Sequence, residues 1–285
     1  MITLNKLSRN RLLEEGFFVI QNVFDAEQLV ALKTLCQSVL LPQDSVEYQN
    51  DHKSIGSLVN IWKEPGFVNY ITSPELLNCF HSLGFNDPRY YYGMVFNKLP
   101  HTPQTFWHQD GDNWAHPDFY KTEPLDVILI CYLQDATIAN GCLRVIPGSH
   151  QKRHCLHDAL KGTYTPDLRR MSDPGSIAFR SFKDEVSVPV KAGGVVFMDA
   201  RLLHATHPNT SDRSRTALSL WFHPNYQELP AEIKARVKAE GGLHPFLPAD
   251  WPQWAKEKLT PLLPPTYTGE VEPLVDQNTP GEMLS

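Results

Sequence analysis

The sequence predicts a mainly β fold: a closed or double-sheet β architecture with helices packed on the outside of one sheet. Short apolar runs that are typical of strands recur from about residue 90 onward, with few long helices between them. Turn signals separate these runs, at Asn140-Gly141, Pro147-Gly148, Gly193-Gly194 and Pro208-Asn209. The first third of the chain has helical periodicity instead. We therefore expect a β core that follows a largely helical N-terminal region.

The composition is that of an ordered, turn-rich protein. The 285 residues include 23 Pro, 14 Phe, 10 Tyr and 6 Trp, whereas disordered chains are poor in aromatic residues. A formal net charge of −6 provides neither a nucleic-acid-binding surface nor a polybasic membrane-binding patch. We find no internal repeat and no linker, so we expect one domain over residues 1–285. The sequence leaves the oligomeric state open.

The same reasoning favours a cytoplasmic location. The apolar run at residues 127–133 is far shorter than the roughly 20 residues that cross a bilayer. Residues 1–15 mix charged side chains into their apolar positions and lack the unbroken core of a signal peptide. The 5 cysteines are odd in number and contain no CxxC pair, which indicates reduced thiols.

Helices are expected in the N-terminal region, about residues 5–85, where they would pack on the β core. Residues 5–15 are polar with leucine anchors, and residues 17–20 form a short apolar strand. Asp25 stands at an N-cap position before apolar residues spaced three and four apart, which predicts an amphipathic helix. A further helix is predicted to begin at Pro74, because proline is favoured in a first helical turn.

Strands of the β core are predicted at residues 90–97, 126–133, 142–146, 186–190, 195–198 and 215–222. In the first of these, Tyr90, Tyr92, Met94 and Phe96 alternate onto one face. An aromatic stripe of this kind is more often core than ligand pocket. The remaining chain, about residues 229–285, is a Pro-rich C-terminal extension with one short helix predicted at 230–240.

A histidine and a carboxylate two residues apart, His108 and Asp110, are the first chemical signal. Residues i and i+2 of a strand project to the same side, so both side chains can reach one metal ion. Such a pair also arises as a hydrogen-bonded surface pair. The second signal is a buried-strand pattern at residues 193–199 followed by His204 and Arg215. Two histidines and one carboxylate form the facial triad of non-haem iron oxygenases, and an inward guanidinium requires an anion such as a carboxylate.

The chain resembles the phytanoyl-CoA dioxygenase family of Fe(II)/2-oxoglutarate oxygenases in three motifs. These are His108-Gln109-Asp110, the run from Asn140 to His150, and the segment from His204 through Asn209 and Ser211 to Arg215. The resemblance extends from about residue 15 to 222. It implies a double-stranded β-helix, the cupin-like jelly roll, with Fe(II), 2-oxoglutarate and O₂ as cofactor and co-substrates.

By the same resemblance, His108, Asp110 and His204 hold iron, and Arg215 pairs with the far carboxylate of 2-oxoglutarate. Thr206 stands where the family commonly has a hydroxyl near the co-substrate, and Met94 matches a strand that lines its pocket. The chain departs from some members in two places: Ser57 aligns near a co-substrate lysine, and Cys131 falls where a tryptophan stands. In halogenating relatives a small residue replaces the carboxylate, so Asp110 favours oxygenation.

Several neighbouring residues have competing interpretations. His207 is the rival iron ligand and Arg213 the rival anion anchor, but His204 and Arg215 keep the family spacing. Three residues that follow the His-x-Asp pair are expected at the cavity mouth, either as substrate contacts or as loop caps: Asp112, Asn113 and Trp114.

The resulting prediction is a dioxygenase that hydroxylates or otherwise oxidises an unactivated C–H bond of a small-molecule metabolite or natural-product intermediate, releasing succinate and CO₂. No cradle for the phosphates of an acyl-CoA is visible in the sequence. One alternative is a zinc-type metallohydrolase that uses the same ligands. Another is a catalytically silent jelly-roll binding protein.

Overall fold

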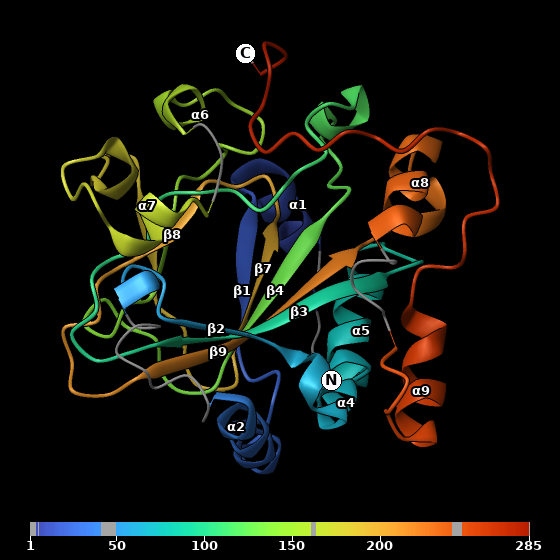
Figure 1. Ribbon diagram of the computed structural model, residues 1–285, viewed down its shortest axis with the longest axis horizontal. Coiled ribbons are helices and arrows are strands. Elements are labelled where there is room, and N and C mark those ends of the chain that lie inside the picture. The colour runs from blue at the N-terminus through green and yellow to red at the C-terminus, as the bar shows by residue number, and fades with distance from the viewer. Residues whose placement is uncertain (1–3, 5, 41–49, 161–163, 241–246, 285) are drawn as a thin grey trace.

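Two antiparallel sheets form the β core of the computed structural model, which describes residues 4, 6–40, 50–160, 164–240 and 247–284 (Figure 1). The large sheet has six strands in the order β1-β7-β4-β9-β3-β2, and the small sheet has three in the order β6-β5-β8. The strands are β1 Phe17–Ile20, β2 Ser57–Asn60, β3 Arg89–Lys98, β4 Val127–Tyr132, β5 Leu143–Val145, β6 Val186–Val188, β7 Val195–Asp199, β8 His204–Thr206 and β9 Arg215–His223. The predicted mainly β fold with flanking helices is confirmed.

The helices are α1 Lys6–Glu15, α2 Ala26–Leu40, α4 Val68–Ile71, α5 Pro74–Ser82, α6 Cys155–Ala159, α7 Pro166–Arg170, α8 Ala231–Glu240 and α9 Gln253–Leu259. Two of the predicted helices, α2 and α5, begin where the sequence provides caps. The Asp25 carboxylate accepts a hydrogen bond from the Gln28 N–H at 2.9 Å, and Ser73 caps α5 ahead of Pro74. None of the helices in the described part of the chain combines the length and apolar character that a membrane span requires.

Alternation along the strands of the large sheet produces two separate cores. On one face, residues such as Val127, Leu129 and Cys131 of β4 pack against the helices, with α2, α4, α5 and α9 on that side (Figure 1). On the other face, Ile128 and Ile130 pack toward the small sheet. Cys131 is therefore buried under the helices, on the face opposite to the cavity described below. The space between the two sheets is left for the functional site.

The expectation that the alternating stripe of β3 is core is wrong for Tyr92, Met94 and Phe96, which line the cavities described below. Two expectations about the elements are also wrong. A β-bulge in β3 shifts the register between Tyr90 and Tyr92, so the alternation does not extend through Tyr90. Tyr90 is fully buried under the helices, while Tyr91 joins Tyr92 on the inner face. The C-terminal extension contains a second helix, α9, whose Ala255 is fully buried in the helical core.

Candidate metal centre and substrate cavity

Two histidines from distant parts of the chain are held side by side by their own backbones. His204 is the first residue of β8, and His108 lies in the segment between β3 and β4. The His108 N–H donates to the His204 carbonyl at 3.0 Å, and the His204 N–H donates to the His108 carbonyl at 2.8 Å. Residues paired in this way project their side chains to the same face. The two ring centroids are 4.1 Å apart.

Hydrogen bonds to backbone carbonyls fix the tautomer of both rings. His108 Nδ1 lies 2.9 Å from the Phe106 carbonyl oxygen, and His204 Nδ1 lies 3.0 Å from that of Leu202. A carbonyl only accepts, so each Nδ1 carries the proton and each Nε2 keeps a free lone pair. Burial, assisted by the neighbouring His204, lowers the pKa of His108 to about 4, so its ring is neutral at pH 7.

Asp110 completes a set of three ligands. Its Oδ1 lies 3.6 Å from His108 Nε2, and its Oδ2 lies 3.8 Å from His204 Nε2. One ligand atom from each of the three residues falls within 4.8 Å of the others. Tyr164 donates its hydroxyl hydrogen bond to Asp110 Oδ1 at 3.3 Å. Two neutral imidazoles and one carboxylate are the donor set of non-haem iron centres, so the residues present fit Fe(II).

A narrow chamber on one side of this triad contains two buried cations. Arg215 begins β9, and the register of the large sheet places it opposite Lys98 at the end of β3. Both residues line the chamber and are 5% and 2% exposed. Burial lowers the pKa of both side chains. Among the described residues that line the chamber, Asp110 supplies the only carboxylate.

These two cations have few partners of their own. Lys98 Nζ donates to the Pro103 carbonyl at 2.7 Å, and one terminal nitrogen of Arg215 donates to the Gly141 carbonyl at 2.9 Å. Arg215 Nε has no hydrogen-bond partner in the described part of the chain. Buried positive charge without a carboxylate partner requires an anionic ligand. The chamber therefore fits the far carboxylate of a diacid.

Thr206 and Met94 lie in different parts of the site. Thr206 lines the cationic chamber, and its hydroxyl is 2.8 Å from the hydroxyl of Thr105. Met94 lines the larger cavity on the other side of the triad. The expected co-substrate role of both residues remains a proposal.

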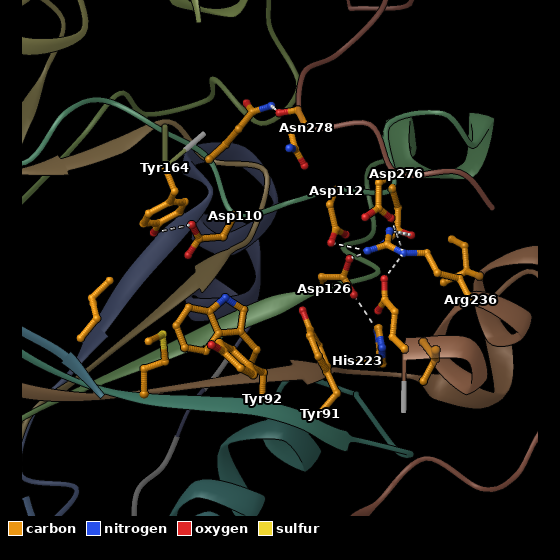
Figure 2. A pocket seen from close by; sticks show the side chains of 18 of the residues that line it. Tyr91, Tyr92, Asp110, Asp112, Asp126, Tyr164, His223, Arg236, Asp276 and Asn278 are labelled. Atoms are coloured by element: carbon orange, nitrogen blue, oxygen red, sulfur yellow. Dashed lines mark hydrogen bonds and ion pairs between the residues drawn. The ribbon is translucent and has the colours of Figure 1, made fainter. Parts of the chain in front are cut away.

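The larger cavity has a volume of about 620 Å³ and is lined by aromatic, apolar and charged side chains (Figure 2). Tyr91, Tyr92 and Met94 reach it from β3, and Trp221 and His223 reach it from β9. The remaining lining residues are Leu58, Phe96, Gln109, Asp110, Asp112, Asn113, Asp126, Tyr164, Arg169, Ile233, Arg236, Val237, Glu240, Asp276 and Asn278. Asp110, Phe96, Tyr164 and Trp221 also line the cationic chamber. The two spaces therefore meet at the triad.

The three residues expected at the cavity mouth are placed differently from one another. Asp112 and Asn113 line the cavity. Trp114 is 1% exposed and packs against Phe119 and Leu284, outside the residues that line the cavity. Burial raises the pKa of Asp112 to about 6. A substrate role for any of the three remains a proposal.

Arg236 of α8 bridges a group of carboxylates at the far end of the cavity. Its guanidinium is paired with Asp112, with Glu240 at 2.5 Å and with Asp276 at 2.7 Å. The oxygen atoms of these three acids lie close enough to hold a metal ion. Because the guanidinium already bridges them, we assign no metal to this group.

The rival residues lie apart from the triad. His207 is half-buried, and its Nε2 is 2.8 Å from the hydroxyl of Ser187. Arg213 is exposed in the turn that precedes β9. Sequence reasoning missed Lys98, Tyr164 and His223. For His223 a signal existed, because it continues the inward alternation of Arg215, Ala217, Ser219 and Trp221 by one step.

The double-sheet fold, the two-histidine, one-carboxylate set and the cationic chamber together define the class of Fe(II)- and 2-oxoglutarate-dependent oxygenases. The family profile described as "Phytanoyl-CoA dioxygenase (PhyH)" matches residues 12–217, and the chain belongs to this family. The family uses Fe(II), 2-oxoglutarate and O₂. The resemblance seen in the sequence is confirmed.

Individual relatives extend the match. The chain is 25% identical over 264 residues to the mouse "Phytanoyl-CoA dioxygenase domain-containing protein 1", covering 73% of this chain and 86% of that protein. Matches to the rat and Dictyostelium discoideum proteins span only about half of those proteins' lengths, 53% and 54%.

Solved structures share the jelly-roll fold. The α-ketoglutarate-dependent carbocyclase SnoK from nogalamycin biosynthesis is 22% identical with a TM-score of 0.59, over 89% of this chain and 96% of that chain. EvdO2 from Micromonospora carbonacea, complexed with 2-oxoglutarate, is 22% identical with a TM-score of 0.57, over 78% of this chain and 92% of that chain. The predicted double-stranded β-helix is confirmed.

Proposed function

We propose that the protein is a 2-oxoglutarate-dependent dioxygenase that hydroxylates or otherwise oxidises an unactivated C–H bond of a small-molecule metabolite or natural-product intermediate. The observation that carries this proposal is the position of the triad between a narrow cationic chamber and a large, partly aromatic cavity. One space suits the co-substrate diacid and the other suits the molecule to be oxidised. When bound, iron with 2-oxoglutarate and O₂ supplies the oxidising chemistry, and the co-products are succinate and CO₂.

The protein's own residues bind and orient the reactants. His108, Asp110 and His204 would hold Fe(II), and Tyr164 holds Asp110 through its hydroxyl. Arg215 would bind the far carboxylate of 2-oxoglutarate as a charge-assisted, bidentate partner.

Further side chains line the two spaces on either side of the triad. Lys98 supplies a second positive charge beside Arg215. The Thr206 hydroxyl lies in the same chamber and donates to the Thr105 hydroxyl, because that hydroxyl itself donates to the Ser54 carbonyl. Met94 lies on the substrate side of the triad, where it adds an apolar wall near the reacting centre. These apolar and aromatic surfaces exclude water from the reaction.

Two other functions use the same ligands but account for less of the site. A zinc-type hydrolase needs the triad and a water molecule, but it has no use for the two buried cations beside the triad. A catalytically silent binding protein would not require three intact metal ligands, nor histidine rings held in the tautomer that leaves Nε2 free to bind metal. A cytoplasmic location is supported by five cysteines that are all free thiols.

An anaerobic titration with Fe(II) and 2-oxoglutarate tests the proposal. We expect the weak visible charge-transfer band of the iron–keto-acid complex, followed on exposure to air by succinate release. His108→Ala should abolish the band, because it removes one of the three ligands. His207→Ala is the matched control, since this histidine lies in the loop after β8 and bonds Ser187 instead. Absence of the band in the unsubstituted protein, or hydrolysis by the zinc form without O₂ uptake, would contradict the proposal.

A further inference from the structure

The large cavity carries an excess of negative charge. The lining of the whole cavity contains five carboxylates against two guanidiniums: Asp110, Asp112, Asp126, Glu240 and Asp276 against Arg169 and Arg236. Figure 2 shows Asp112, Asp126 and Asp276 gathered around Arg236, at the end of the cavity away from Asp110. Since Arg236 already pairs with three acids, it does not offset the remaining charge.

His223 presents an unpartnered acceptor at this end. Its side chain lines the cavity, and the residue is 3% exposed. Its Nδ1 lies 2.5 Å from Asp126 Oδ1 and 3.3 Å from the Leu125 carbonyl oxygen, so Nδ1 carries the proton. In the neutral ring Nε2 is then an acceptor, and it has no hydrogen-bond partner within the described residues.

A chain of two hydrogen bonds, which ends in the ion pair between Asp126 and His223, holds this histidine in place. Asn113 Nδ2 donates to Asp126 Oδ2 at 2.7 Å, and Arg236 donates to Asn113 Oδ1 at 2.9 Å. Asn113 is 3% exposed and uses both ends of its amide in these contacts. It therefore positions the Asp126–His223 pair, and its amide is not free for a ligand.

Gln109 presents a second unpartnered acceptor. Its Nε2 donates to the Asn278 carbonyl at 2.9 Å, and because a carbonyl cannot donate, the other amide atom must be the oxygen. The residue is 3% exposed and lines the cavity, and Oε1 has no partner in the described chain. Buried acceptors without partners are rare in folded proteins and require a donor.

The aromatic side chains that line the same cavity suit a ring that bears a positive charge. The Tyr91 ring stacks on the His223 ring, with 4.3 Å between the ring centroids, and the ring centroids of Tyr92 and Trp221 are 5.3 Å apart. Aromatic faces attract cations through their quadrupole, and they pack well against rings.

We propose that the large cavity selects an amine-bearing ring compound, whose ammonium group and other donors bind His223 Nε2, Gln109 Oε1 and the acidic wall. This inference rests on the proposed function for calling that compound a substrate. It excludes multiply anionic substrates such as an acyl-CoA, because like charges would be brought together in a site of low dielectric.

Three probes that share one skeleton test the charge preference on the full-length, metal-free chain carrying Arg215→Ala, because this substitution removes the guanidinium that would otherwise bind the carboxylate probe in the cationic chamber. Isothermal titration calorimetry would compare tyramine (ammonium), tyrosol (hydroxyl) and 4-hydroxyphenylacetate (carboxylate). We expect tyramine to bind at least roughly 10-fold more tightly than the carboxylate, with tyrosol between them and with the tyramine affinity falling as salt rises. Equal or tighter binding of 4-hydroxyphenylacetate, or no binding of tyramine up to about 10 mM, would overturn the proposal.

Variants then locate the binding site. Glu240→Gln and Asp276→Asn change side chains that are 39% and 62% exposed, so both should fold, and each should weaken tyramine about two- to fivefold while leaving tyrosol unchanged. Gln109→Met and His223→Phe should weaken both tyramine and tyrosol. Asp135→Asn, a surface carboxylate paired with Lys191, is the matched control and should change neither affinity. Unchanged tyramine binding in Glu240→Gln and Asp276→Asn would contradict the assignment.

The two proposals fail separately. Tyramine binding to the metal-free chain does not depend on iron, 2-oxoglutarate or turnover. If the charge-transfer band is absent while the probe ranking holds, the cavity selects amines without being an oxygenase site. If the band forms but the ranking is reversed, the oxygenase assignment stands and the amine preference is wrong.

Discussion

At the scale of single residues, local spacing predicts the triad better than it predicts the groups around it. His108 and Asp110 are two positions apart in the sequence, and that spacing alone brings them to one side of an extended segment. Lys98 gave no such signal. It reaches the site because β3 pairs with β9 and brings it opposite Arg215, a long-range register that no local pattern contains. The contact between Tyr164 and Asp110 likewise depends on the path of the loop that carries Tyr164, which no local pattern predicts.

Removal of the buried cations should weaken the co-substrate and spare the metal. We expect Arg215→Ala to weaken 2-oxoglutarate binding by about 2 kcal/mol or more, because it removes a desolvated charged partner. Lys98→Met should weaken it by a smaller factor. Calorimetry of 2-oxoglutarate binding to the Mn(II)-loaded protein measures both effects, and Mn(II) affinity should stay within about twofold. Lys191→Met, which alters an exposed lysine, is the control, and unchanged 2-oxoglutarate affinity in Arg215→Ala would refute the chamber assignment.

The hydroxyl of Tyr164 should contribute to metal affinity. Tyr164→Phe removes the hydrogen bond to Asp110 and keeps the ring that packs on Phe106 and His108. Outer-shell partners of this kind change metal affinity by about 10- to 100-fold, so we expect Fe(II) to bind at least roughly tenfold more weakly. Competition with a chromogenic chelator measures the change. Tyr120→Phe, whose hydroxyl bonds the Trp114 carbonyl, should leave Fe(II) binding unaltered.

At the scale of elements, capped helices and alternating strands were predictable, and departures from regularity were not. Asp25 and Pro74 mark helix starts through their own side chains. The bulge at Tyr91 lacks such a marker, although it adds one aromatic ring to the cavity wall. Helix α9 was missed because it lies among prolines, and its stability comes from burial of residues such as Leu259 in the helical core.

Several contacts hold the C-terminal segment beyond α9, and one of them can be tested alone. Leu284 is 6% exposed and packs with Trp114 and Phe119. Leu284→Ala should lower the free energy of local opening of residues 274–284 by about 2 kcal/mol, because it removes buried apolar surface. Hydrogen exchange measures that opening. Met283→Ala, which changes a neighbour that is 56% exposed, should have little effect, and equal protection in both variants would show that Leu284 does not anchor the segment.

At the scale of the whole molecule, a buried histidine outside the site should make stability depend on pH. Burial lowers the pKa of His157 to about 4, and its Nδ1 accepts a hydrogen bond from the His154 N–H. The unfolded chain, with a histidine pKa of about 6.5, therefore binds more protons between these values. Stability is fully present above about pH 6.5 and falls as pH drops toward 4, by up to about 3 kcal/mol for this group.

Denaturant unfolding of the metal-free chain at several pH values measures this dependence. His157→Asn should flatten the profile between pH 4 and 6.5. His101→Asn is the control, because this side chain is 65% exposed and its positive φ suits asparagine. An equally steep profile in His157→Asn would assign the dependence to other groups, of which His108 in the triad is the next candidate.

At this scale the order and type of the helices and strands were predictable, because a double-sheet core is marked in the sequence by alternating apolar residues and by turn residues between strands. The division of the interior into two spaces was not predictable, because it depends on which side chains from β3 and β9 meet. That the chain forms one domain over residues 1–285 stays a prediction.

A single strand, β9, carries inward-facing residues of both spaces. Arg215 stands at its start, Trp221 lies where the spaces meet, and His223 ends it. Eight steps of antiparallel strand span roughly 27 Å, and a paired central strand changes length very little. Strand β9 therefore fixes the separation between the two spaces. On the proposed amine preference, the number of bonds between a substrate's amine and its oxidised carbon should be constant across accepted compounds, so a homologue with one more methylene should react at the adjacent position.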